Sequence, residues 1–461
     1  MKVARSCLIL SLFLVLALAQ DNGQIFERYQ EVAGRLIGAA MVDESGWAKL
    51  KYLCDRIGNR LSGSAAPERA VDWASQQMRQ DGLLNVVTPA VKVPHWVRGN
   101  ESIEVLEPVQ RSLPMLGLGG SVGTPSAGIT ADVVAVSSFE ELEKLPRSQI
   151  RGRIILYDVP FEGYGQTVVY RRDGPSRAAA LGAVAVLIRS IGPISLQTPH
   201  TGSLGYDDAA PRIPAAALSI EGATLLHRLA ESGQRVRVRL AMEAQMLPDA
   251  DSANVIGEIP GREFPNQVVV MGGHLDSWDV GQGAHDDGAG CIAALQAAAL
   301  IQQLGLRPRR TIRVVLWTNE ENGLAGGRAY REWVGERISD HVAAIEMDGG
   351  AEQPIGFGMA VPPGNPAFER AFQNVQGIGR LLQGIGAGGM FRGGGGADIG
   401  PLMQDGVPGF GLRTVGEHYF DWHHTEADTL DKIDPQNFKK NVAAMAVLAF
   451  ILADMPSRLI E

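Results

Sequence analysis

The sequence predicts an α/β protein in which a mostly parallel sheet carries helices on both faces and a strand-rich domain is inserted before most of that sheet. Three observations lead to this prediction. Strand-like and helix-like segments alternate after Pro248, which is the pattern of a parallel sheet built from strand–helix units. The strand-like segments are unbroken apolar runs, as expected for strands buried on both faces. A Gly-, Pro- and Ser-rich stretch over residues 111–128 separates two regions of different texture.

Residues 1–19 have the features of a signal peptide. Lys2 and Arg5 precede an apolar run over residues 7–18, and the segment ends in the small-residue pattern Ala17-Leu18-Ala19. This run is shorter than the roughly 20 apolar residues that cross a bilayer, and no other segment approaches that length. We therefore expect a secreted or periplasmic protein with no membrane span.

Two further segments precede the alternating region. Residues 20–110 are predicted to be an N-terminal helical part, because apolar residues recur at helical spacing between residues 25 and 85. Residues 111–248 are predicted to be the inserted domain, which has a helical piece at 176–181 and several strand-like runs. These runs are residues 132–136, 153–157, 184–188, 213–218 and 236–240.

Residues 249–461 are predicted to form the main sheet and most of its helices. The strand-like segments are residues 268–271, 312–317 and 342–347. The helix-like segments are residues 291–304, 324–334, 368–375 and 435–452. The last of these carries an apolar stripe that is suited to packing on a sheet.

Charge and cysteine content limit the possible partners. The net charge of -9 disfavours nucleic acid, because phosphate backbones are bound by clustered Lys and Arg. Removal of the signal peptide would leave Cys54 and Cys291. Two distant cysteines do not define a disulfide framework, so pairing and buried free thiols both remain open.

Acidic and imidazole side chains follow three successive predicted strands. His274 follows the first strand, Glu320 and Glu321 the second, and Asp348 the third. Functional groups of parallel α/β sheets collect just outside the carboxyl ends of the strands. Because adjacent side chains point in different directions, one glutamate of the pair can bind a metal while the other handles protons. The four residues therefore predict a catalytic metal site at this edge.

Two aspartates near His274 fit the same site. Asp276 is two residues away on an extended chain, from where it can reach the imidazole and fix its tautomer. Asp286 precedes a predicted helix, whose first backbone N–H groups favour a carboxylate. Three of the nine histidines, His418, His423 and His424, cluster near the C-terminus. One of them is expected to complete the site, but the spacing does not select it.

Imidazole and carboxylate ligands without sulfur suit a pair of zinc ions, with cobalt or manganese as substitutes. A carboxylate such as Asp286 can bridge two ions about 3.5 to 4 Å apart, the separation used in hydrolysis.

Together these motifs resemble those of the di-zinc aminopeptidase and glutamate carboxypeptidase family. The matching stretches are residues 273–279, 286–288, 319–321, 347–348, 396–399 and 423–429. The resemblance implies the di-zinc exopeptidase fold with a catalytic unit formed by residues 20–110 and 249–461. It also implies that residues 111–248 are a protease-associated domain, and it suggests a homodimer.

The resemblance assigns roles residue by residue. It implies that Asp286 bridges two zinc ions per subunit, that His274 and Asp348 bind one of them, and that Glu321 and His424 bind the other. It further implies that Glu320 is the general base, that Asp276 steadies His274, and that the Asp286–Asp287 peptide is cis. His285 stands where relatives often carry a non-ionisable residue, which leaves its role open.

The implied function is hydrolysis of dipeptides or short peptides by a metallodipeptidase or carboxypeptidase. An aminopeptidase of the same family is the main alternative. A one-zinc glutaminyl cyclase or an inactive binding protein fits less well, because no ligand is missing. Residues expected to hold the tetrahedral oxygen or a substrate carboxylate are His423, Tyr419, Arg392 and Arg413.

Overall fold

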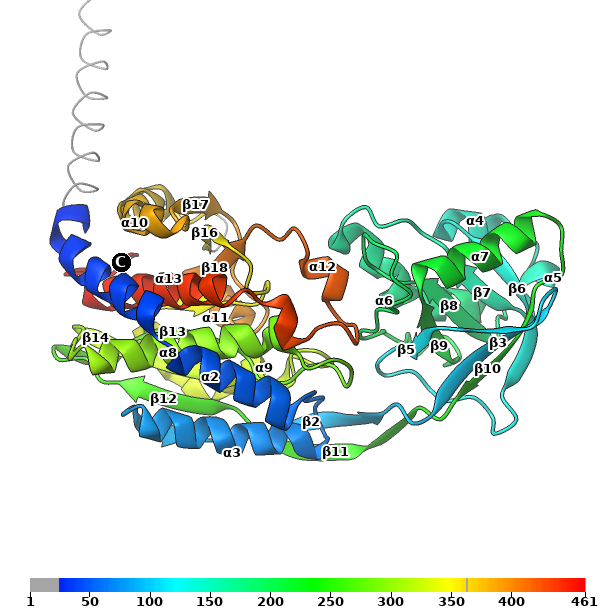
Figure 1. Ribbon diagram of the computed structural model, residues 1–461, viewed down its shortest axis with the longest axis horizontal. Helices are drawn as coiled ribbons and strands as arrows, with labels where there is room; N and C mark the ends of the chain where they lie inside the picture. The colour runs from blue at the N-terminus through cyan, green and yellow to red at the C-terminus, as the bar shows by residue number, and fades with distance from the viewer. Residues whose placement is uncertain (1–24, 362–363, 461) are drawn as a thin grey trace, which may run out of the picture.

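The computed structural model describes residues 25–361 and 364–460 (Figure 1). The predicted signal peptide, residues 1–19, lies outside these described residues. The chain forms an eight-stranded main sheet, a second eight-stranded sheet and a two-stranded ribbon. Figure 1 shows the ribbon running along the lower side of the view from the main sheet toward the second sheet. We call the part built on the second sheet, residues 101–242, the insertion unit.

The main sheet has the strand order β1-β12-β14-β13-β15-β18-β16-β17. Its centre is parallel, because β13 pairs in parallel with β14 and β15, and β15 with β18. The pairs β1–β12, β12–β14 and β16–β18 are antiparallel. The strands are β1 (Leu84–Val87), β12 (Val255–Ile259), β13 (Phe264–His274), β14 (Arg310–Trp317), β15 (His341–Glu346), β16 (Pro354–Ala360), β17 (Gly389–Arg392) and β18 (Gly409–Thr414).

Helices cover both faces of the main sheet, because the central strands alternate their apolar side chains between the faces. Val269 and Met271 of β13 belong to the core that contains α8 and α13. Val268 and Val270 belong to the opposite core, which contains Tyr330 of α9. The predicted α/β class is therefore confirmed. The helices of this part are residues 25–42, α2 (Ser45–Tyr52), α3 (Ala65–Gln80), α8 (Ala289–Gln303), α9 (Ala325–Val334), α10 (Phe368–Leu382), α11 (Gly400–Gln404), α12 (Tyr419–Trp422) and α13 (Pro435–Asp454).

The second sheet has the order β4-β3-β10-β6-β7-β8-β9-β5 and also carries an apolar cluster on each face. Its strands are β3 (Glu101–Glu107), β4 (Arg111–Leu113), β5 (Met115–Gly117), β6 (Ile129–Val136), β7 (Ile154–Tyr157), β8 (Ala185–Arg189), β9 (Ala215–Leu218) and β10 (Arg237–Met242). Its helices are α4 (Phe139–Lys144), α5 (Arg147–Ile150), α6 (Tyr164–Ala180) and α7 (Ile220–Glu231). The ribbon consists of β2 (Ala90–Val97) and β11 (Gln245–Ala253).

The segment 20–110 contains strands as well as the expected helices, since β1, β2 and β3 fall within it. These strands pair with β12, β11 and β10 respectively, which all come more than a hundred residues later. The helical spacing of apolar residues between residues 25 and 85 could not reveal pairing with strands so far along the chain. The domain limits at residues 110 and 248, and the protease-associated character of the inserted domain, stay predictions.

The two cysteines of the described chain, Cys54 and Cys291, are free and buried. Of the two possibilities left open by the sequence, the structure therefore has free thiols. Among the described residues, no helix has the length and apolar character needed to cross a membrane.

Candidate active site

The predicted strand-end residues meet at the carboxyl edge of the parallel strands β13, β14 and β15. His274 is the last residue of β13, opposite Trp317, which ends β14. Glu320 and Glu321 follow β14, and Asp348 follows β15, which ends at Glu346. Because these strands are parallel and in register, their C-terminal residues arrive at the same edge.

Asp286 reaches this edge from the short turn between β13 and α8. The turn, Ala284–Gly288, has non-helical backbone angles at Asp286 and Asp287, and the peptide between them is cis. The carboxylate of Asp428 accepts the backbone N–H groups of His285 and Asp286 at 2.8 and 3.2 Å. Asp287 accepts the N–H groups of His274 and Gly290, both at 3.1 Å. Two buried carboxylates thus hold the backbone on either side of Asp286.

Asp286 lies between two imidazole–carboxylate pairs. On one side, His274 Nε2 is 3.1 Å from Asp286 Oδ1 and 3.5 Å from Asp348 Oδ1. On the other side, His424 Nε2 is 3.3 Å from Asp286 Oδ2 and 3.1 Å from Glu321 Oε2. One oxygen of Asp286 is therefore directed toward each pair.

The chemistry of this cluster fits bound metal ions. Several groups of three donor atoms lie within 4.8 Å of one another, including His274, Asp286 and Glu321, and His274, Asp287 and Asp348. Within the described residues, Asp286 Oδ2 and Glu321 Oε1 are buried without a hydrogen-bond partner. Buried carboxylate oxygens normally have partners, so these two oxygens are free to bind cations.

Both imidazoles present Nε2 to the cluster because Nδ1 is engaged elsewhere. His274 Nδ1 lies 3.1 Å from the carbonyl oxygen of Asp276, and His424 Nδ1 lies 3.3 Å from that of Thr201. A carbonyl oxygen accepts only from a protonated nitrogen, so in each neutral ring Nε2 keeps its lone pair for a metal.

The two adjacent glutamates differ in their surroundings. Glu321 is buried against His424, whereas Glu320 is partly exposed in the hollow beside the cluster. Burial, together with the negative charges of Asp348 and Glu321, raises the pKa of Glu320 well above its usual range. Burial also raises the pKa of Glu321, to about 7, so exposure and pairing, and not pKa, distinguish the two glutamates. Glu320 is the one that is left open to the hollow and unpaired with His424.

Asp276 is fully buried and supports more than the imidazole. Its carbonyl oxygen, not its carboxylate, makes the short contact with His274, since Oδ1 is 3.7 Å from Nδ1. The carboxylate accepts the backbone N–H groups of Glu320 at 2.9 Å and Glu321 at 3.3 Å. Asp276 therefore joins the ends of β13 and β14.

A hollow of about 560 Å³ opens in front of the cluster, between the main sheet and the insertion unit. His423 and Tyr419 line it together with the insertion-unit residues Tyr164, Arg171 and Ser203. The imidazoles of His423 and His424 stack with ring centroids 3.6 Å apart.

The structure does not bring Arg392 and Arg413 to this hollow. Arg392 ends β17, the edge strand of the main sheet, where its exposed guanidinium pairs with Glu369 at 2.5 and 2.8 Å. Arg413 lies on β18 and donates to the carbonyl oxygen of Gly393 at 3.0 Å. Sequence position alone could not place these side chains, because it does not reveal that three strands separate β17 from β13 and one separates β18 from β13.

Other histidines of the region have structural partners. His285 is buried, and its Nδ1 accepts the backbone N–H of Ala351 at 3.1 Å, so it supports the loop after β15. His418 is largely exposed and pairs with Asp421 at 2.8 Å. Of the three clustered histidines, His423 and His424 are the two that line the hollow.

Sequence reasoning missed several supporting residues. Asp287 and Asp428 stand inside the recognised motifs, but a motif does not reveal that a side chain binds backbone N–H groups. Thr201, Ser203 and Arg171 come from the insertion unit and reach the site only through the fold, so no local signal marked them.

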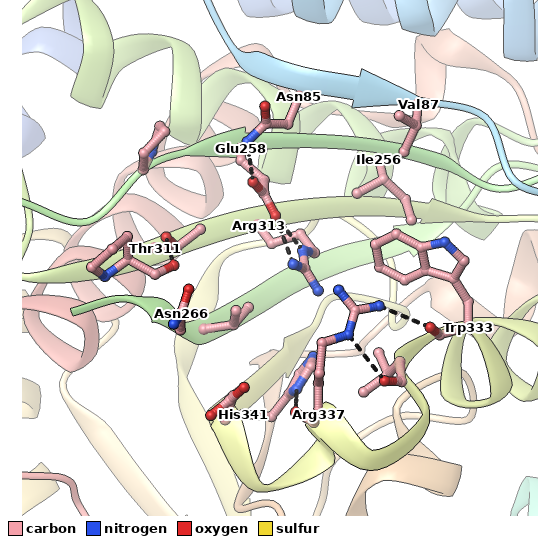
Figure 2. Close-up of a pocket in the computed structure, with 15 residues that line it drawn as sticks. Asn85, Val87, Ile256, Glu258, Asn266, Thr311, Arg313, Trp333, Arg337 and His341 are labelled. Carbon is pink, nitrogen blue, oxygen red and sulfur yellow. Dashed lines mark hydrogen bonds and ion pairs between the residues drawn. The ribbon is translucent and has the colours of Figure 1, made fainter.

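A larger hollow of about 660 Å³ lies away from this cluster, beside the β1 edge of the main sheet (Figure 2). The side chains of Glu258, Arg313 and Arg337, which are labelled in Figure 2, are paired with residues that line the same hollow. Glu258 accepts from Asn85 at 2.7 Å and from Arg313 at 2.6 and 2.8 Å. Arg337 donates to the carbonyl oxygens of Val334 and Trp333. We therefore place the functional site at the strand-end cluster.

An α/β sheet with a parallel centre and this carboxylate–imidazole cluster at its carboxyl edge defines a metal-dependent hydrolase. The chain belongs to peptidase family M28, whose sequence pattern matches residues 254–449. Carboxypeptidase Q of Mus musculus is 42% identical over 434 residues, covering 94% of this chain and 91% of that protein. The sequence motifs predict that the chain resembles carboxypeptidase Q within this family. The identity of 42% over nearly the whole chain confirms this prediction.

The chain is also similar to an aminopeptidase sequence and to a crystal structure of a family member. A probable leucine aminopeptidase 2 of Aspergillus oryzae is 25% identical, covering 87% of this chain and 82% of that protein. The crystal structure of a peptidase M28 precursor from Shewanella amazonensis superposes with a TM-score of 0.90 at 34% identity, covering 95% of this chain and 99% of that one. The fold of the whole described chain is therefore that of a family member.

Proposed function

We propose that this chain is a zinc-dependent exopeptidase that hydrolyses dipeptides or short peptides, as a carboxypeptidase Q-like metallodipeptidase. One observation carries the proposal: Asp286 directs one carboxylate oxygen to the His274–Asp348 pair and the other to the Glu321–His424 pair. Membership of peptidase family M28 and the similarity to carboxypeptidase Q support it.

In this proposal His274 and Asp348 would hold one zinc ion and Glu321 and His424 would hold a second, with Asp286 contributing to both. When bound, the ions supply Lewis-acid activation of water and of the peptide carbonyl. The neutral imidazole nitrogens and unpartnered carboxylate oxygens described above are donors that zinc prefers.

Glu320 is the general base of the proposed reaction. Its carboxylate takes a proton from the attacking water and returns that proton to the nitrogen of the leaving amine. Glu320 is available for these two steps because Glu321, and not Glu320, pairs with His424. Asp276 positions this base by accepting its backbone N–H.

Two side chains in the hollow are candidates for contact with the substrate. His423 Nε2 lies 3.6 Å from Asp286 Oδ2, so the ring stands beside the shared ligand. Tyr419 packs its ring against that of His423 with centroids 5.2 Å apart. We assign them to the tetrahedral oxygen or to a substrate carboxylate.

An aminopeptidase is the second candidate function, supported by the similarity to a leucine aminopeptidase. A one-zinc cyclase would not need the complete His274–Asp348 pair, and an inactive binding protein would not need Glu320. The two exopeptidase functions differ in the substrate end that is recognised, so substrates blocked at either end separate them.

The test combines metal analysis with a substrate panel. The purified protein is expected to contain two zinc ions per chain and to hydrolyse unblocked dipeptides. N-acetyl dipeptides, dipeptide amides and aminoacyl nitroanilides then locate the end that is required. Fewer than two zinc ions with glutamine cyclisation, or no peptide hydrolysis, would refute the proposal.

We further propose export by the signal peptide over residues 1–19, and a homodimer in solution. Detection of a mature N-terminus after Ala19 tests the first proposal. Sedimentation velocity at micromolar concentration tests the second, since a monomer would contradict it.

A further inference from the structure

The insertion unit contacts the backbone of two proposed metal ligands through one short loop, residues 200–203, which we call the docking loop. Figure 1 shows α6 of this unit on the side that faces α12 of the main part. The docking loop follows α6 and β8 in the chain and reaches Glu321 and His424, the ligand pair on one side of Asp286.

Thr201 makes two reciprocal contacts with His424. The backbone N–H of Thr201 donates to the carbonyl oxygen of His424 at 2.9 Å. The carbonyl oxygen of Thr201 lies 3.3 Å from His424 Nδ1. These contacts fix both the backbone and the ring of a residue whose φ of +61° is uncommon for a side-chain-bearing residue.

Ser203 reaches the other member of the pair. Its hydroxyl donates to the carbonyl oxygen of Glu321 at 2.8 Å. Among the described residues, no hydrogen bond joins the docking loop to His274 or Asp348, so the loop contacts one side of the cluster.

Arg171 of α6 holds the docking loop in shape. The guanidinium is buried, and it donates to the carbonyl oxygens of Thr201 at 3.0 Å and Ser203 at 3.1 Å. Another nitrogen donates to the Tyr164 hydroxyl at 2.8 Å. Its Nη1 also lies 3.4 Å from His424 Nδ1, so the guanidinium touches the ring of the proposed ligand as well as the loop. Charged donors form strong hydrogen bonds with carbonyl oxygens.

Gly202 allows the close approach. A Cβ atom at this position would lie 2.1 Å from Arg171 Nη1 and 2.8 Å from His424 Nδ1. With its φ of +130°, the position suits glycine on both steric and backbone grounds. The other side of the loop is anchored, since the Thr201 hydroxyl donates to the carbonyl oxygen of Gly117 in β5 at 2.8 Å.

We propose that the insertion unit positions one half of the metal site. Ser203 positions Glu321 directly. Arg171 positions His424 both through the docking loop and through its own contact with the His424 ring. This inference rests on the proposed metal-binding function. It predicts that weakening the docking loop loosens the zinc ion held by Glu321 and His424 and spares the ion held by His274 and Asp348.

The test is a chelator titration of the full-length holoprotein that resolves the two zinc ions. In Arg171→Met and Ser203→Ala we expect one ion to be removed at a chelator concentration about tenfold or more below that for wild type, the usual scale for groups that support metal ligands. The second ion should be unchanged. Arg177→Met is the matched control, because Arg177 lies on the same helix and its exposed side chain pairs with Glu143.

The outcomes distinguish a failure of the proposed function from a failure of the proposed role of the docking loop. Wild type without two zinc ions refutes the proposed function itself. Two ions in wild type that stay equally tight in both variants, or that are loosened to the same extent, refute the role of the docking loop. If Arg171→Met does not fold by circular dichroism, Ser203→Ala decides the question.

Discussion

The Oδ1 atom of Asp276 accepts the backbone N–H of Glu320 at 2.9 Å, and this bond fastens the end of β13 to the segment after β14. The same aspartate receives the Glu321 N–H through Oδ2 and contacts His274 through its carbonyl oxygen. One buried residue therefore supports the proposed base and a ligand on each side of Asp286.

Loss of the Asp276 carboxylate should impair catalysis more than substrate binding. In Asp276→Ala, the N–H groups of Glu320 and Glu321 lose their acceptor, so we expect kcat to fall about 10- to 100-fold with little change in KM. Steady-state kinetics on a dipeptide measures this. Asp208→Ala, at an exposed position, is the control. Unchanged kcat in Asp276→Ala would contradict the supporting role.

Asp428 should stabilise the turn that carries Asp286. Replacing it by Ala leaves the N–H groups of His285 and Asp286 without their acceptors. We expect the free energy of unfolding to fall by about 1 to 3 kcal/mol and zinc affinity to fall with it. Urea unfolding of the zinc-free protein separates the two effects. If Asp428→Ala keeps the wild-type free energy of unfolding and the wild-type zinc affinity, the Asp428 carboxylate does not stabilise this turn.

Substitutions of His423 and Arg392 should affect kcat/KM differently, because only His423 lines the hollow, although the sequence predicts substrate contact for both. His423→Asn should lower kcat/KM by about tenfold or more, because His423 stands beside Asp286. Arg392→Ala should leave kcat/KM within about twofold of wild type, because its exposed side chain pairs with Glu369 at the sheet edge. Equal losses in the two variants would refute this placement of the substrate.

His341 should make stability depend on pH. It is buried and neutral, with Nε2 2.9 Å from the Tyr330 hydroxyl and Nδ1 3.3 Å from the Arg337 carbonyl oxygen. Burial, followed by the nearby charge of Arg313, lowers its pKa to about 4. The unfolded chain, with a pKa near 6.5, then binds more protons between these two values, so stability falls as pH falls through this window.

When the pH is lowered from 7.5 to 5, the free energy of unfolding should fall by about 2 kcal/mol because of His341. The measurement is urea unfolding of wild type and His341→Gln at both pH values. The variant should lose about 2 kcal/mol less than wild type over this interval. Equal losses would mean that His341 is not held neutral.

The strand-end residues could be predicted because a parallel sheet gathers the ends of its strands at one edge. His274, Glu320, Glu321 and Asp348 follow from this rule alone. His424 follows no strand of the predicted sheet and lies just after a one-turn helix, so its spacing was uninformative and only the family resemblance selected it.

The contributions of the insertion unit could not be predicted in this way. Thr201, Ser203 and Arg171 are ordinary residues that meet the site only when two distant segments dock. Strands β1, β2 and β3 escaped prediction for the same reason, because their partners β12, β11 and β10 lie far along the chain. Arg392 and Arg413 lie on β17 and β18, away from the hollow, which could not be predicted because their sequence positions do not reveal the strand order.

The most direct test compares the adjacent glutamates as a matched pair. Glu320→Gln should retain two zinc ions per chain by elemental analysis while kcat for dipeptide hydrolysis falls by about 100- to 10,000-fold, the usual contribution of a general base. Glu321→Gln should lose zinc. If Glu320→Gln loses its zinc ions, or keeps two ions and nearly full activity, the division between metal ligand and general base is wrong.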